Sequence, residues 1–167
     1  MEALAAAAIL GGLNTIGDYA TAVLELQSRP LYALARAAVI GYCLGGIVGA
    51  RARQIFIGAI SGLLIGIFVG IGYQALTPSL GWRALLVAAP VFWIGFSFLE
   101  TVLHGDSTAA AALLRGLAAA AVSGLVFYVI ASAWPEPKPN DPNLARLLVV
   151  WIGGFFPGFL LLFWKRL

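Results

Sequence analysis

Residues 55–76, IFIGAISGLLIGIFVGIGYQAL, form an uncharged run of 22 residues that decides the fold class. At 1.5 Å per residue, a helix of this length crosses a hydrocarbon core of about 30 Å. Glycine recurs at every fourth position of the run, at Gly58, Gly62, Gly66 and Gly70. This spacing places the glycines on one helix face, so the run predicts a transmembrane helix that a second helix can approach closely.

The preceding apolar segment, residues 31–50, carries a matching glycine stripe at Gly41, Gly45 and Gly49. One interpretation is that the two stripes pack against each other and form a tight transmembrane hairpin. In the other, one stripe faces outward and makes a homo-oligomer or holds another membrane subunit. If the two stripes do not face each other, a single hairpin does not account for both of them. We therefore expect the protein to form a homo-oligomer or to bind another membrane subunit.

The composition extends the membrane assignment to the whole chain. Hydrophobic residues make up 62% of the 167 residues and charged ones 10%, against about 25% charged in soluble domains. We therefore predict an all-α, polytopic integral membrane protein that forms a single domain in the lipid bilayer. Its six predicted transmembrane helices lie at about 3–24, 31–50, 55–76, 84–103, 108–134 and 144–164.

Prolines mark the predicted interruptions. Pro78, between Thr77 and Ser79, is expected to end the third helix. The segment 135–142 holds four prolines and predicts a stiff external loop. Pro157, which lies among glycines, is expected to interrupt the sixth helix and free backbone carbonyls.

The basic residues give a predicted orientation in a plasma membrane or bacterial inner membrane. Six crossings put both termini on one side. That side holds Arg51, Arg53, Lys165 and Arg166, whereas the other holds Arg29, Arg83 and Lys138, the last amid Glu136 and Asp141. Because positive charge favours the cytoplasmic side, we expect both termini to be cytoplasmic.

The two halves of the chain share a charge pattern. An acidic residue lies late in the first helix of each half, Asp18 and Glu100, and an arginine lies early in the second, Arg36 and Arg115. The third helix of each half is rich in glycine. Halves of three helices must lie in opposite orientations, so the pattern predicts a 3+3 inverted repeat of the kind found in transporters.

Charges at membrane depth are costly unless they are paired or hydrated, so Asp18 is expected to pair with Arg36 and Glu100 with Arg115. These pairs can serve as two gates, one at each membrane face, or as simple clips between helices. Asn14 lies deeper, where it can bind an ion or bridge two helices by hydrogen bonding.

The sequence offers little for chemistry outside the membrane. Cys43 is the only cysteine and His104 the only histidine, and no recognisable nucleotide-binding, haem-attachment or catalytic motif is present. The net charge of +3 is small and sits near helix ends, which does not suit nucleic-acid binding. We expect no enzymatic activity, catalytic residue, metal site or cofactor.

Two functional hypotheses follow. The first is a small transporter or channel-like protein for a small solute, with the two charge pairs at its mouths and Asn14 and Pro157 near the path. The second is a non-catalytic subunit that docks into a larger membrane complex through its glycine stripes.

Overall fold

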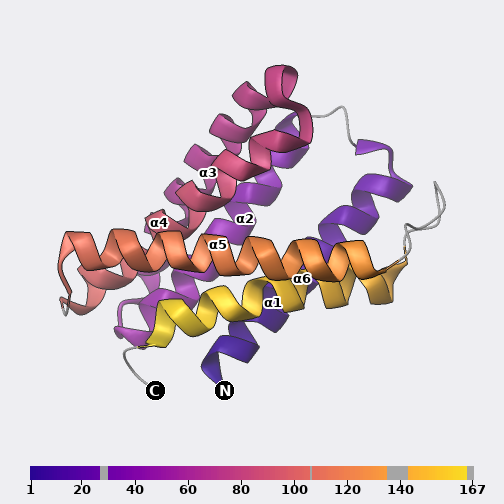
Figure 1. The fold of residues 1–167 in the computed structure, drawn as a ribbon. Helices are drawn as coiled ribbons and strands as arrows, with labels where there is room; N and C mark the ends of the chain where they lie inside the picture. Colours follow the sequence, from indigo (N-terminus) through magenta and orange to yellow (C-terminus); the bar gives the residue numbers. More distant parts are fainter. Residues whose placement is uncertain (27–29, 106, 135–142, 165–167) are drawn as a thin grey trace.

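The computed structural model describes residues 1–26, 30–105, 107–134 and 143–164, and the regular structure in them is helical (Figure 1). Six α-helices follow one another, with the short 3₁₀ helix η2 (Gly81–Ala84) before the fourth. Their bounds are α1 Glu2–Val23, α2 Pro30–Arg51, α3 Ile55–Leu80, α4 Leu85–His104, α5 Ala109–Ala133 and α6 Leu144–Phe163.

Five of these helices, α2 to α6, are long and apolar enough to cross a membrane. This confirms the prediction of an all-α polytopic membrane protein. The helix outside this group is α1, which has 22 residues like α2 but carries Glu2, Asn14 and Asp18. Its crossing of the bilayer stays a prediction from the sequence.

The helices close into a ring in chain order. Each helix packs against the next one along the chain, and α6 returns to pack against α1, so the two chain ends lie near each other (Figure 1). The α5–α6 pair crosses the α2–α3 pair obliquely. In this ring α4, α5 and α6 follow one another as α1, α2 and α3 do, and each group of three is joined to the other at both ends. An inverted repeat would have this order, and the superposition of the two halves stays a prediction.

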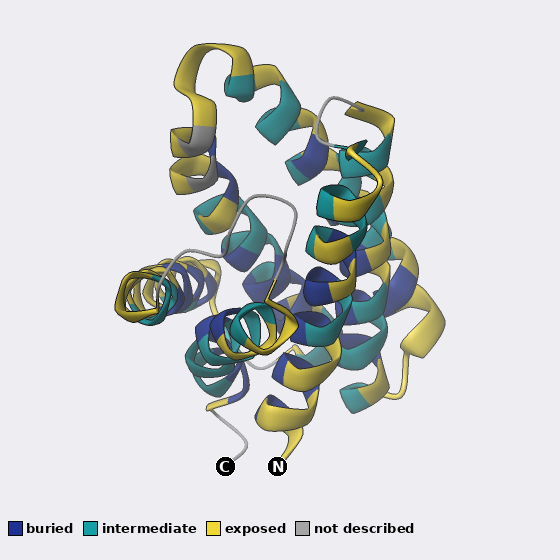
Figure 2. Ribbon diagram, turned by 90° about the vertical axis from the view of Figure 1, so that its right-hand side faces the viewer, coloured by how far each residue is buried: buried dark blue, intermediate teal, exposed yellow. Residues whose placement is uncertain are grey.

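The core fills the middle of the ring with side chains from α1, α2, α4, α5 and α6. Leu10, Leu44, Phe96, Phe159 and Leu162 are fully buried there. In the view of Figure 2 the buried residues face the middle of the molecule and the exposed residues lie on its outside, and many of the exposed residues are large and apolar. Exposed apolar side chains are the expected outer surface of a protein that lies in lipid.

Helix α3 lies outside this core and is held chiefly by α2, in the most extensive helix–helix contact of the molecule. A Cβ placed on Gly45 would overlap the carbonyl oxygen of Gly58 and lie 2.7 Å from Cα of Gly62. The same holds along the seam, where Gly41 faces Gly62 and Gly66. The two stripes face each other, and their contact is backbone against backbone.

Two predicted helix breaks are wrong. Helix α3 continues through Pro78 to Leu80, and α6 continues through Pro157. A proline removes one bond of the helical ladder, and a membrane helix tolerates this loss because the flanking turns keep theirs. Near Pro78 the hydroxyl groups of Thr77 and Ser79 donate to the carbonyls of Tyr73 and Leu76. The predicted loop 135–142 and the charges Arg29, Lys138, Lys165 and Arg166 lie outside the described residues.

Candidate functional site: two buried charge clusters

The first cluster joins α1 to α2 where α1 nears its end. Arg36 Nη1 donates to Asp18 Oδ1 at 2.6 Å, which is the predicted ion pair. Side-chain exposure is 30% for Asp18 and 21% for Arg36. Gly17 makes the approach possible, because a Cβ there would lie 2.6 Å from Nε of Arg36. The guanidinium group therefore lies across the backbone of α1.

Asn14 completes the binding of this arginine. Arg36 Nη2 donates to Oδ1 of Asn14 at 2.8 Å and to the Asn14 carbonyl at 3.1 Å. The amide nitrogen of Asn14 donates to the Leu10 carbonyl at 3.0 Å. Asn14 thus bridges α1 and α2, one of its two predicted roles, and the planar guanidinium suits several acceptors at once.

Sequence reasoning missed two members of this cluster. Trp151 of α6 donates its indole N–H to Asp18 Oδ2 at 2.6 Å, so the second carboxylate oxygen is also satisfied. The hydroxyl of Tyr32 donates to the Gly17 carbonyl at 2.8 Å. A pairing of α1 with α6 spans 133 residues, and no local spacing in the sequence indicates it.

The second cluster joins α4 to α5 in the equivalent way. Arg115 Nη1 donates to Glu100 Oε2 at 2.7 Å, and Nη2 donates to the Ser107 hydroxyl at 2.9 Å. Ser107 also lies 3.3 Å from the hydroxyl of Thr101. Side-chain exposure is 2% for Glu100 and 10% for Arg115. This cluster is the more deeply buried of the two.

His104 lies against the second cluster, which the sequence reasoning did not anticipate. Its Nδ1 is 2.8 Å from the Glu100 carbonyl oxygen and 3.5 Å from Oε1 of the same residue. The imidazole side chain is 3% exposed. The spacing of four residues on one helix was the available signal, because it places both side chains on one face.

The two clusters lie at opposite ends of the molecule. Asp18 and Arg36 meet where α1 ends and α2 begins, and Glu100 and Arg115 meet where α4 ends and α5 begins. Three helices separate these two places along the chain, and neighbouring helices run in opposite directions (Figure 1). Each end of the ring is therefore crossed by one carboxylate–arginine pair.

A column of aromatic rings runs along α6 from Trp151 through Phe155 and Phe159 to Phe163. Successive ring centroids lie 5.7, 6.1 and 5.7 Å apart. The spacing of four residues stacks these side chains on one helix face, and this signal is present in the sequence. The column lies beside α1 and forms part of the core.

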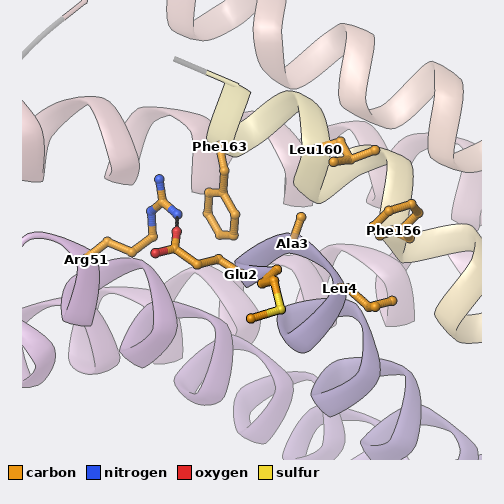
Figure 3. Close-up of a pocket in the computed structure, with 8 residues that line it drawn as sticks. Glu2, Ala3, Leu4, Arg51, Phe156, Leu160 and Phe163 are labelled. Atoms are coloured by element: carbon orange, nitrogen blue, oxygen red, sulfur yellow. Dashed lines mark ion pairs between the residues drawn. The ribbon is translucent and has the colours of Figure 1, made fainter. Parts of the chain in front are cut away.

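An arginine lies over the ring at each end of this column. Arg36 lies 5.9 Å from the Trp151 ring centroid, and Arg51 lies 4.0 Å from that of Phe163. Arg51 also forms an ion pair with Glu2 (Figure 3). A groove of about 500 Å³ opens here between the start of α1 and the end of α6, next to both chain ends.

Pro157 is a predicted site residue that the structure does not bring to either cluster. It lies six residues beyond Trp151, about 9 Å along the helix axis. The neighbouring Gly158 admits Ser123 and the Trp93 ring against the α6 backbone.

The described residues contain no group of three or more histidine, cysteine or acidic side chains suited to a metal ion. Comparison of the chain with protein-family models, curated proteins and solved structures gave no match. The functional argument therefore depends on the two charge clusters.

Proposed function

We propose that this protein moves a small solute across the membrane and that the two charge clusters are its gates. The observation that supports the proposal is the pair of carboxylate–arginine contacts, one at each end of the ring and each between the first and second helices of a half. We assign no enzymatic activity to it.

The energetics favour gates over clips. Burying an ion pair costs several kcal/mol per ion, and apolar residues of similar volume often hold helices together as well or better. Both ends nevertheless use a carboxylate and an arginine instead of apolar residues. Charged groups suit a contact that opens, because water can then hydrate them. Alternating access needs such a reversible contact on each side of a central barrier.

The middle of the ring is the barrier in this proposal. Leu10, Phe96 and Phe159 fill it. A wide aqueous pore does not fit this core. We therefore propose a small, uncharged solute, carried when the helices of one half move relative to those of the other.

The test is solute flux into proteoliposomes, followed by stopped-flow light scattering after an osmotic step with glycerol, urea or acetamide. The unmodified protein should accelerate the entry of at least one of these solutes over protein-free vesicles. D18N and E100Q remove one charge from each gate and should abolish that flux while the helical circular dichroism stays unchanged.

The matched control is E2Q, which removes a carboxylate from an ion pair outside both gates. The Glu2 side chain is 71% exposed, and its loss should leave flux unchanged. If D18N and E100Q transport as fast as E2Q, the assigned gate roles are wrong. If no variant and no parent protein accelerates any of the three solutes, this transport proposal fails.

The orientation is part of the proposal. The end of the molecule that holds the start of α1 and the end of α6 also holds Arg51 and Arg53, whereas Arg83 follows α3 at the other end. Because positive charge favours the cytoplasmic side, we propose that this end faces the cytoplasm, in a plasma membrane or bacterial inner membrane. Reporter fusions to each terminus, active only in the cytoplasm, would test this placement.

The alternative function, a non-catalytic subunit of a larger complex, would need a docking surface other than the facing parts of the two stripes. Gly45 and Gly62 pack against each other inside one chain. Affinity purification in mild detergent, read by native mass, would test association. Stoichiometric capture of other membrane proteins would favour the subunit function over transport.

A further inference from the structure

We infer that His104 is a proton-binding site that controls the gate formed by Glu100 and Arg115. The inference deepens the transport proposal, because it names the ligand that opens one end. Its evidence is the arrangement of three ionisable side chains, and it can be tested without any transported solute.

The hydrogen-bond geometry defines the ring nitrogen that accepts the proton. The backbone carbonyl of Glu100 can only accept, so the Nδ1 atom 2.8 Å from it carries the hydrogen. In the neutral ring, Nε2 then holds a lone pair. Nε2 is buried and has no hydrogen-bond partner among the described residues. The proton forms a bond to this lone pair, and a hydronium ion is left as water.

The charge balance explains why the added proton opens the gate. The charged groups described around the ring are Glu100 on its own helix and Arg115 on α5; Asp106 lies outside the described residues. With neutral His104 the three groups sum to zero, and the cluster can stay dry. Protonation gives the cluster a net charge of +1, with the His104 and Glu100 side chains almost fully buried. An uncompensated buried charge is strongly unfavourable, so water has to enter.

The other cluster has no equivalent group. Asp18 accepts from the Arg36 guanidinium and from the Trp151 indole, and neither donor changes its charge near neutral pH. Histidine is the side chain whose ordinary titration range lies near neutrality. The two ends of the ring are thus alike in their ion pairs and different in their response to protons.

Nitrogen-15 NMR of the histidine ring tests the first step. His104 is the only histidine, so its two ring signals are unambiguous in protein carrying a tag without histidine. In lipid nanodiscs at pH 8 we expect the neutral ring with its hydrogen on Nδ1. Between pH 8 and 5 the Nε2 signal should move to that of the charged ring.

Thiol accessibility tests the second step. Ser97 lies on α4 about one turn before Glu100 and is fully buried. Its hydroxyl has no hydrogen-bond partner among the described residues. S97C in a C43A background therefore places a reporter thiol behind the gate. Its reaction with a water-soluble methanethiosulfonate is normalised to A110C, because residue 110 is exposed on the first turn of α5.

Lowering the pH from 7.5 to 6.0 cuts the reactive thiolate of an ordinary cysteine roughly 30-fold. The A110C rate should also fall, and the H104Q background gives the change in rate ratio that thiol chemistry alone produces. The rate ratio of S97C to A110C should rise at least tenfold, and H104Q should abolish the rise.

Two results would overturn the inference: a ring that stays neutral down to pH 5, or an unchanged S97C to A110C ratio. Neither readout depends on solute flux, so a protein that fails every flux assay can still pass both tests. Conversely, flux that persists with a constant accessibility ratio would reject the proton site and leave the transport proposal standing.

Discussion

The seam between α2 and α3 makes a quantitative prediction about a single methyl group. In G45A the new Cβ would lie 2.7 Å from Cα of Gly62, and ordinary contacts begin at 3.4 Å. The helices must therefore move apart by at least about 0.7 Å, because the carbonyl oxygen of Gly58 would lie closer still, and a gap of this size forfeits a quarter to a half of each contact along the seam. Overpacking of this kind costs about 1–3 kcal/mol.

The adjacent glycine provides the control. In G46A the Cβ would lie 3.8 Å from the Cβ of Ala59, which is an ordinary contact. Alanine is also favoured over glycine in a helix by up to about 1 kcal/mol, and both variants share this gain. G46A should be neutral or slightly stabilised, and the free energy of unfolding of G45A should lie about 1–3 kcal/mol below that of G46A, because the shared gain cancels in the comparison.

Thermal unfolding in detergent measures the difference. Cys43 is the only cysteine and is partly buried, so a fluorogenic thiol reagent reports its exposure as the protein unfolds. We expect G45A to melt several degrees below G46A, at roughly 2–4 °C per kcal/mol. Equal melting temperatures would refute the close backbone contact between the two stripes.

The same assay checks three further variants. W151F removes the indole donor to the Asp18 carboxylate and should cost about 1.5–3 kcal/mol, the usual value of a hydrogen bond to a charged group; no change would place the indole elsewhere. E100L should cost about 3–5 kcal/mol because it leaves Arg115 buried without its carboxylate, and E100L/R115L should recover most of the loss. Equal stability of the single and double variants would contradict a buried pair. E2Q removes a carboxylate that is 71% exposed from Arg51, which is 9% exposed and stays over the Phe163 ring, so it should cost less than E100L; a loss as large as that of E100L would contradict this difference.

Local patterns in the sequence were enough to predict most of the fold. Apolar runs predicted the helices, and the glycine spacing of residues 41–49 and 58–70 predicted the hairpin that the structure forms. The ion pairs were predictable because each joins helices that are consecutive in the chain. A short connection leaves an acid late in one helix and an arginine early in the next at similar depth.

The errors and omissions have two physical causes. Pro78 and Pro157 were expected to break helices, but the bilayer offers a chain no better alternative to helix, and one missing bond does not outweigh that. The contacts of Trp151 with Asp18 and Arg36 depend on how α6 returns to α1. Such a contact between the two ends of the chain follows from the ring and cannot be read from local spacing.

The return of α6 to α1 also determines the order in which the molecule can be assembled. A chain emerges from the ribosome N-terminus first, at about 5–20 residues per second. Asp18 is therefore synthesised long before Trp151, its partner 133 residues later. Arg36 can pair with the Asp18 carboxylate early. The second carboxylate oxygen gains its indole donor only after α6 has been made. Helix α1 is thus made first and secured last, so the newly made protein passes through a stage in which α1 is attached on one side only.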